Sequence, residues 1–254
     1  MPASTDTKES RIGTIAKLNA SEQAYNERMR KLEKEARRPG LSLSHTYVYY
    51  DGLSSMLMGL DAGNIDEMST YKCVAKYISA QNKKLEDLHH TQNMADSFCC
   101  AVRKEDTDLC NSINNAIKSM REDGTLNNLI QTYITSSEDF QPVEIPKTYG
   151  ADTIRVGVTG DLPPLDLILA DGRPAGFNTA MVAEIGKRIG KNIELVQIES
   201  SARASAITSK KIDVVFWVSV PYEYDLPANI DQPEELAVTS AYYLDDIVHV
   251  GLKK

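Results

Sequence analysis

The sequence predicts an α/β protein of two lobes, each built on a parallel sheet with helices on both faces. Two observations support this prediction. Short β-branched or apolar segments alternate with segments of helical periodicity in both halves of the chain. Helix stop signals and a stretch without periodicity separate the two halves. The composition fits a globular protein, since 42% of the 254 residues are hydrophobic and 25% are charged.

The N-terminal half is predicted to form a β-α-β-α-β unit. The expected strands are 11–16, 46–50 and 65–70, and the expected helices are 21–38, one from residue 53 and one around 74–78. Ser21 is the predicted N-cap of the first helix, which ends at Pro39-Gly40. Gly63 closes the second helix, because glycine readily adopts the left-handed conformation of a helix end.

The C-terminal half repeats this pattern after two further helices. Those helices are expected over 108–120, closed by Gly124, and from the cap Thr125 onward. Residues 136–152 hold two prolines and no periodicity, which predicts a linker. The last unit comprises strands 154–158, 193–198, 212–218 and 247–252, a helix capped by Asn178 or Thr179, and a short helix 201–210. Strand 212–218 is apolar on both faces, as in a central parallel strand.

Charge and composition exclude several function classes. The net charge is −8 and the pI about 5.1, which disfavours nucleic acid as a partner. No apolar run reaches the length of a membrane helix. The four cysteines form no CxxC pair and are expected to be buried thiols, although a Cys73–Cys110 disulfide stays open. No histidine has ligand spacing to them, so no metal and no cofactor is expected.

Ligands of open parallel sheets collect beyond the carboxyl ends of the strands. In the first unit this rule selects 17–19, Asp51 and Tyr71, and in the second unit 159–161 and 219–221. Two lobes that face each other across these edges would enclose a cleft.

Several segments resemble a known family. Residues 154–213 resemble the first lobe of the extracellular solute-binding proteins of family 3, the amino-acid-type receptors of ABC transporters, through Pro163-Pro164, Asp171-Gly172, Gly176-Phe177 and Lys210-Lys211-Ile212-Asp213. Residues 47–78, with the turn Gly63-x-Ile65-Asp66, resemble the second lobe, and residues 101–134 resemble the return segment that normally closes such chains. The resemblance implies a two-lobed, type II periplasmic-binding-protein-like fold.

The order of these parts differs from that of the family. The predicted domains are 1–97 for the second, smaller lobe, 98–137 for a hinge strand and return helices, 138–152 for the linker, and 153–254 for the first, larger lobe ending in a hinge strand. The order therefore indicates either a circular permutant or the junction of a tandem array. With new chain ends placed at the hinge, we expect one continuous crossing, a mostly monomeric chain and a minor lobe-swapped dimer.

The resemblance also implies a ligand site. Amino-acid-binding members carry an arginine beyond the central first-lobe strand, but 216–224 contains none, and Tyr71 stands where the family has an aspartate. We therefore expect weak binding of standard amino acids and favour a small polar or cationic solute that aromatic rings can contact. The candidate ligand-binding residues are Asp161, Trp217, Ser219, Tyr71, Asn19, Asn178, Tyr50, Asp51 and Arg203.

Five of the residues considered have structural alternatives. Trp217 faces either the pocket or the core, and Tyr71 lines the pocket or packs on the linker. Asp161 binds a ligand or shapes the Pro-Pro turn, Asp66 is expected to be structural, and Arg203 is either a substitute carboxylate anchor or a solvated side chain.

The resulting functional prediction is a non-enzymatic solute-binding domain that closes about a hinge and works with ABC transporter membrane subunits. The alternatives are a sensor or degenerate interaction domain of the same fold, and an enzyme of the prephenate dehydratase kind, for which the needed arginine and general acid are not in register. The first ten residues are polar, so no signal segment is expected there. The resemblance implies an extracellular, periplasmic or lipid-anchored protein.

Overall fold

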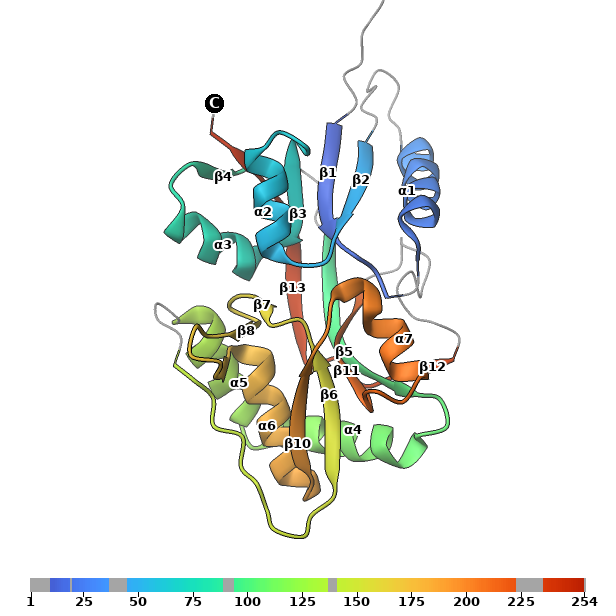
Figure 1. Cartoon of the computed structure of the whole chain (residues 1–254), viewed down its shortest axis with the longest axis vertical. Helices are drawn as coiled ribbons and strands as arrows, with labels where there is room; N and C mark the ends of the chain where they lie inside the picture. Colours follow the sequence, from blue (N-terminus) through green and yellow to red (C-terminus); the bar gives the residue numbers. More distant parts are fainter. Residues whose placement is uncertain are drawn as a thin grey trace, which may run out of the picture.

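The computed structural model describes residues 10–18, 20–36, 45–88, 94–136, 141–222 and 235–253. The elements at its N-terminal end form a small lobe (Figure 1). They are β1 (Ser10–Ile15), α1 (Glu22–Ala36), β2 (His45–Tyr50), α2 (Leu53–Asp61), β3 (Glu67–Tyr71), α3 (Lys72–Gln81) and β4 (Leu85–Asp87). β1 pairs in parallel with β2 and β3, as predicted for a β-α-β-α-β unit.

The large lobe contains the second unit and the two intervening helices. Its elements are α4 (Thr107–Glu122), α5 (Thr125–Ile130), the π-helix η1 (Gln131–Thr135), β6 (Thr153–Val158), α6 (Phe177–Ile189), β10 (Asn192–Gln197), the 3₁₀ helix η2 (Ser200–Ala202), α7 (Arg203–Thr208), β11 (Val214–Tyr222) and β12 (Leu236–Val238). A small antiparallel sheet is formed by β7 (Asp161–Leu162), β8 (Asp166–Ile168) and β9 (Pro174–Ala175). α4 and α5 pack against α6, within the large lobe.

Two long strands, β5 (Met94–Arg103) and β13 (Tyr243–Leu252), join the lobes. They make one continuous sheet in the order β10-β6-β11-β5-β13-β3-β1-β2, with β12 on β5 and β4 on β13. The predicted α/β two-lobed fold class is therefore confirmed, but the lobes share one mixed sheet in place of the two separate parallel sheets that were predicted. The permuted order stays a prediction. The described residues include no helix with both the length and the apolar character that crossing a bilayer requires.

The register of the crossing strands corrects the prediction of a single continuous crossing. Residues 94–98 of β5 pair antiparallel with residues 243–247 of β13, so the two crossings lie side by side. β13 then continues into the small lobe, where it pairs with β3 and β4. Lys253, its neighbour, donates a hydrogen bond from its backbone N–H to the carbonyl of Lys84. The hinge is doubly tethered, and the described chain ends lie in the small lobe instead of at the hinge.

Each lobe fastens its first strand through an arginine–aspartate pair. In the small lobe, Arg11 Nε lies 3.2 Å from Asp66 Oδ2, and the Arg11 backbone N–H donates to the same oxygen at 2.9 Å. In the large lobe, Arg155 Nη2 lies 3.0 Å from Asp213 Oδ1, and its backbone N–H again donates to the carboxylate, at 3.0 Å. The aspartates of the Gly-x-Ile-Asp and Lys-Lys-Ile-Asp turns therefore have one structural role, as expected for Asp66.

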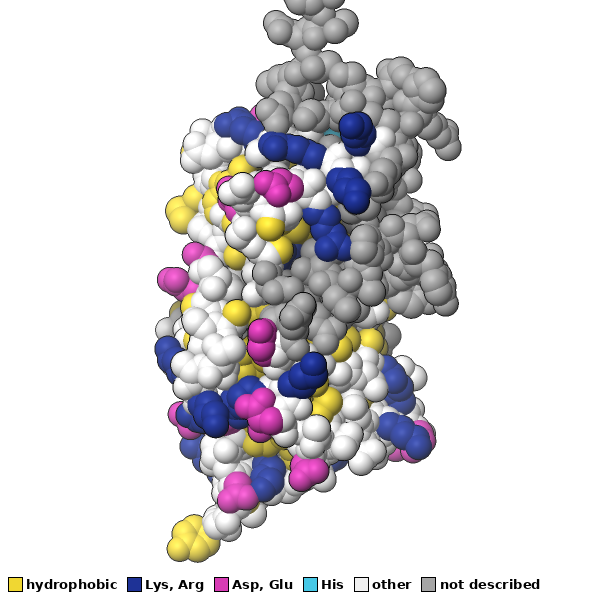
Figure 2. All heavy atoms as spheres, turned by 90° about the vertical axis from the view of Figure 1, so that its right-hand side faces the viewer, with side chains coloured by type: hydrophobic (Ala, Val, Ile, Leu, Met, Phe, Trp, Pro, Cys, Tyr) yellow, Lys and Arg dark blue, Asp and Glu magenta, His cyan; other side chains and the backbone are white. Residues whose placement is uncertain are grey.

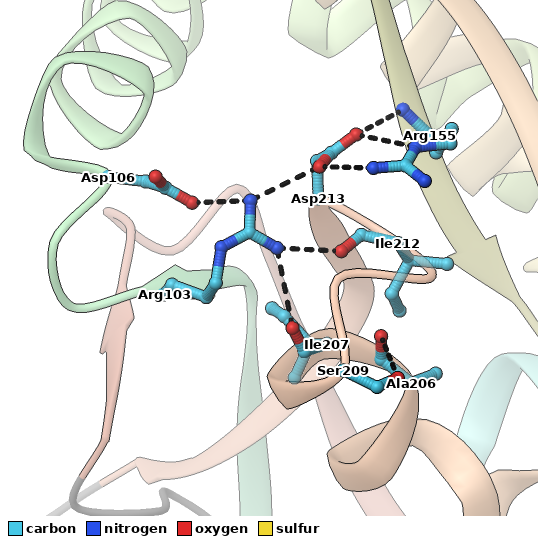
Figure 3. A network of polar contacts seen from close by, with 8 residues as sticks. All are labelled: Arg103, Asp106, Arg155, Ala206, Ile207, Ser209, Ile212 and Asp213. Carbon is cyan, nitrogen blue, oxygen red and sulfur yellow. Dashed lines mark hydrogen bonds and ion pairs between the residues drawn. The ribbon is translucent and has the colours of Figure 1, made fainter.

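The large lobe adds a second arginine to this pair (Figure 3). Arg103, at the end of β5, contacts Asp213 Oδ1 at 3.1 Å and Asp106 at 2.7 Å. It also donates to the carbonyl of Ile212 at 2.8 Å, beside the end of α7. Arg103 thus ties the crossing strand to the helix and the turn that precede β11.

The predicted linker is docked along the large lobe. The backbone N–H of Val143 donates to the carbonyl of Pro174 at 2.8 Å. Further on, the Asn192 side chain accepts from the N–H of Thr148 at 2.7 Å and donates to the Thr148 carbonyl at 3.0 Å. These bonds hold residues 141–152 against the lobe whose first strand they precede.

One hydrophobic core runs through both lobes, because Tyr71, Phe98 and Trp217 pack together at the hinge. The four cysteines are free thiols, which excludes the Cys73–Cys110 disulfide. Thr125 and Thr179 lie inside α5 and α6, whose N-caps are Gly124 and Gly176. On the described lower part of the face in Figure 2, acidic and basic side chains are intermixed, without a patch of one sign.

Candidate functional site

A cavity lies between the lobes, beside the crossing strands. Both lobes and both crossing strands contribute to its lining, which consists of Thr14, Ile15, Ala16, Lys17, Ser69, Thr70, Tyr71, Asp96, Leu162, Arg203, Trp217 and Ile247. The space open to the centres of water molecules is ≈ 30 Å³. That is room for about two waters, so a larger solute enters only when the lobes separate.

Arg203 is the most unusual residue of this cavity. Its side chain comes from α7 of the large lobe and is only 2% exposed. It donates to three backbone carbonyls: Ser200 at 3.1 Å, Trp217 at 3.0 Å and, across the cleft, Ala16 at 2.8 Å. Among the described residues no carboxylate lies within ion-pair distance of it, and the buried Asp166 carboxylate interacts with it only through the electrostatic field. The alternative of a solvated Arg203 is wrong, because the helix turns it into the cleft.

Trp217 and Tyr71 form the aromatic wall of the cavity. Trp217 is 4% exposed, packs edge-on against Tyr71 at a centroid distance of 5.3 Å, and lies under the Arg203 guanidinium at 5.7 Å. The ring therefore belongs to the core and also lines the cavity, so the two alternatives for Trp217 do not exclude each other. Tyr71 likewise lines the cavity instead of packing on the linker.

Asp96 is a cavity residue that the sequence reasoning missed. It lies on β5 and accepts a hydrogen bond from the Tyr71 hydroxyl at 3.1 Å, while being only 6% exposed. The rule that selects carboxyl ends of parallel strands does not reach it, because β5 is an antiparallel crossing strand. The sequence held one signal for it. If Met94–Arg103 is a strand, every second side chain shares a face, so Asp96 lies on the same face as Phe98.

Asp161 and Asp51 make contacts between the lobes at the rim of the cleft. Asp161 accepts from the Ser54 N–H at 3.0 Å and from the Ser54 hydroxyl at 2.8 Å. Asp51 accepts from the Ser201 N–H at 3.0 Å. Neither lines the cavity. Asp161 therefore binds the opposite lobe, which neither of its predicted alternatives included.

Two other candidates with described side chains, Asn178 and Tyr50, do not line the cavity. Asn178 is fully buried in the large lobe, where its side-chain oxygen accepts from the Tyr242 hydroxyl at 3.0 Å. Tyr50 packs over Gly59 of α2 and is absent from the cavity lining. The backbone of Ser219 pairs with Phe98. Asn19 lies outside the described residues. Among the candidates whose side chains are described, the structure thus brings together Arg203, Trp217 and Tyr71.

Asp166 is a buried carboxylic acid next to the cleft loop after β6. It is 1% exposed and accepts from the Thr159 hydroxyl at 2.9 Å. Burial raises its pKa from 3.8 to about 6, although the bonds from Thr159 and Gly160 and the positive charge of Arg203 oppose the shift. The described residues hold no cluster of three or more His, Cys, Asp or Glu side chains able to bind a metal ion.

We expect replacement of Asp166 by asparagine to remove one pH dependence of stability. Because the folded-state pKa is raised, folding favours the protonated acid, and stability falls as the pH rises from about 4 to about 6. The free energy of unfolding falls by about 3 kcal/mol in total, and this loss is complete above pH ~6. The neutral amide avoids this loss, so the variant should gain on the parent over that interval. Urea unfolding of both proteins at pH 4.5 and 7.5 measures it, and parallel pH profiles would contradict it.

One family of known proteins is similar to a segment of the chain. The sequence model of the bacterial extracellular solute-binding proteins, family 3, matches residues 154–220. That segment holds β6, α6 and β11, and the match confirms the predicted resemblance there. No curated protein sequence matches the chain.

Several solved structures match most of the chain at low identity and with TM-scores below 0.5. The GluR0 ligand-binding core in complex with L-glutamate is 11% identical, covers 98% of this chain and 86% of that one, and has a TM-score of 0.46. A nutrient-binding protein of Burkholderia cenocepacia bound to methionine is 12% identical (96% and 84% covered, TM-score 0.44). A mutant of the OxyR2 regulatory domain from Vibrio vulnificus is 11% identical (100% and 91% covered, TM-score 0.47).

Proposed function

We propose that this chain is a solute-binding domain that closes its two lobes over a small polar solute. One observation carries the proposal: Arg203 places a buried cation, whose hydrogen-bond acceptors among the described residues are all backbone carbonyls, in a cavity that both lobes line. A buried charge is costly unless a counter-charge meets it. The oxyanion of a bound solute would supply that charge, and the family match over 154–220 supports a binding function over catalysis.

The charges of the cavity refine the solute class. Among the described lining residues, Arg203 and Lys17 are the cations and Asp96 is the one carboxylate. This balance favours a solute with an anionic group, in place of the neutral or cationic solute expected from the aromatic rings together with scattered carboxylates and amides. Asp96 accepts a bond from Tyr71 and can accept one from a solute N–H or O–H group. Standard amino acids, for which weak binding was expected, are therefore the first solutes to test.

Replacing Arg203 by methionine should weaken solute binding by about 10- to 100-fold, because one charge-assisted contact is lost. A thermal-shift panel of amino acids, small organic acids, polyamines and short peptides finds the solute. A solute at 100 times its Kd adds about 2.7 kcal/mol of stability. Calorimetry then compares the parent, Arg203→Met and the control Arg173→Met, whose arginine lies exposed on the surface beside Asp171. Equal affinities of parent and Arg203→Met would contradict the proposed site.

The alternative is a sensor or an interaction domain whose pocket has degenerated. The small size of the cavity favours this alternative, since it accepts only about two waters in the closed form. A folded protein that no solute in the panel stabilises would support it. We further propose the permuted domain order, ABC transporter membrane subunits as partners, an extracellular or periplasmic location and a mostly monomeric state. Light scattering over a concentration series tests the last of these.

A further inference from the structure

Residues 51–54, which we call the latch loop, make two reciprocal contacts with the large lobe. In the first contact, the carboxylate of Asp51 in the loop accepts a hydrogen bond from the backbone N–H of Ser201 in η2, at 3.0 Å. In the second contact, Ser54 of the loop donates hydrogen bonds from its backbone N–H and its hydroxyl to the carboxylate of Asp161 in the large lobe, at 3.0 and 2.8 Å. Each aspartate thus caps the first turn of a helix in the opposite lobe, where backbone N–H groups lack partners within the helix.

Gly52 of the latch loop leaves the space that the contact with Asp161 needs. The N-cap of α2 is Gly52, which has no side chain to cap its own helix. A Cβ atom at Gly52 would lie 2.6 Å from Asp161 Oδ2, closer than any such contact normally found. The backbone of Gly52 is extended, at φ −158°, so another residue could adopt it. Glycine is therefore required at this position because the carboxylate of Asp161 needs the space. The backbone conformation would permit other residues.

A third contact lies deeper in the cleft, where Arg203 donates across it to the carbonyl of Ala16 at 2.8 Å. All three contacts join protein groups directly, and none needs a solute. They lie on different elements of the large lobe: β7, η2 and α7. They also connect to separate points of the small lobe, at the end of β1, at the end of β2 and in the first turn of α2.

We infer that the latch loop holds the two lobes closed in the solute-free chain, as a reciprocal latch that opening must break. Opening then separates Asp51 from Ser201 and Asp161 from Ser54 together, because both pairs share one short loop. The inference concerns the solute-free protein, so its test is independent of the proposed solute site.

The substitution Gly52→Ala tests the latch directly. The added methyl group displaces Asp161 in the closed form and meets no such obstacle in the open form. Small-angle scattering of the solute-free protein should show a compact parent and an expanded Gly52→Ala variant. The control Asp61→Ala removes an exposed carboxylate at the other end of α2 and should scatter like the parent. An open solute-free parent, or a Gly52→Ala variant as compact as the parent, would overturn the inference.

Hydrogen exchange at the Ser54 and Ser201 amides tests whether the two contacts act as one unit. In Asp161→Ala, the Ser54 amide loses its acceptor and should exchange about fivefold faster or more. If the two contacts act as one latch, the amide of Ser201, which Asp161 does not touch, should also exchange faster in Asp161→Ala. In Asp51→Ala, the amide of Ser54 should likewise exchange faster, although Asp51 does not touch it. Unfolding by denaturant identifies any variant that has lost its fold. If each substitution changes exchange only at the amide that had donated to the replaced aspartate, the two contacts are independent, and this result would overturn the latch.

Discussion

Replacing Asp213 by alanine should lower the free energy of unfolding by about 3 kcal/mol, because the substitution leaves two arginines without their shared carboxylate. Asp213 binds the guanidinium groups of Arg155 and Arg103 and the backbone N–H of Arg155. The Arg103 side chain is mostly buried and also supports two carbonyls near α7. Urea unfolding followed by circular dichroism measures the loss.

The small lobe provides the matched comparison for this prediction. Asp66 makes the corresponding bonds to Arg11, and that pair is more exposed than the one in the large lobe. Asp66→Ala should therefore cost about 1 kcal/mol. Asp171→Ala, which removes an exposed pair with Arg173, should change the stability least of the three variants. Equal losses for Asp213→Ala and Asp66→Ala would show that Arg103 adds nothing to the network.

Replacing Trp217 by alanine should cost about 3–5 kcal/mol, the range for large aromatic residues removed from a core. The ring packs against Phe98 at a centroid distance of 5.0 Å and against Tyr71 at 5.3 Å, where the cores of the two lobes meet. Trp217→Phe keeps an aromatic ring and should cost about 1 kcal/mol. Thermal and urea unfolding of both variants check these values.

A small loss for Trp217→Ala would contradict this assignment and show that the ring serves the cavity instead of the core. Trp217 is the only tryptophan of the chain, so its fluorescence reports on the cavity in the parent protein. A change of emission on solute addition would therefore come from the residue that lies under Arg203.

Local signals were sufficient for most of the secondary structure. β-branched runs predicted β1, β2, β6 and β10 within one or two residues, because strand propensity and alternation are short-range properties. Stop signals such as Gly190 placed helix ends well, since the required left-handed conformation is local. The two-lobed class also followed from the sequence, through the order of these elements.

The site depended on contacts that no local pattern contains. Arg203 lies on a short helix and would be solvated in isolation, yet packing of α7 against β11 turns it into the cleft. Asp96 joins the cavity only because β5 crosses between the lobes beside Tyr71. Asp51 and Asp161 lie in different lobes and far apart in the sequence, and only closure of the lobes brings each to a helix start in the other.

What the sequence by itself determined, then, is the set of helices and strands, the α/β class and the structural role of Asp66, because each rests on neighbouring residues. Only the tertiary structure decided that both crossings are continuous, that Arg203 and Asp96 share one cavity, and that the lobes meet through reciprocal aspartates. The physical reason is the range of the interactions. Propensity and capping act within a few residues, whereas ion pairing and burial act between groups that only the complete fold brings together.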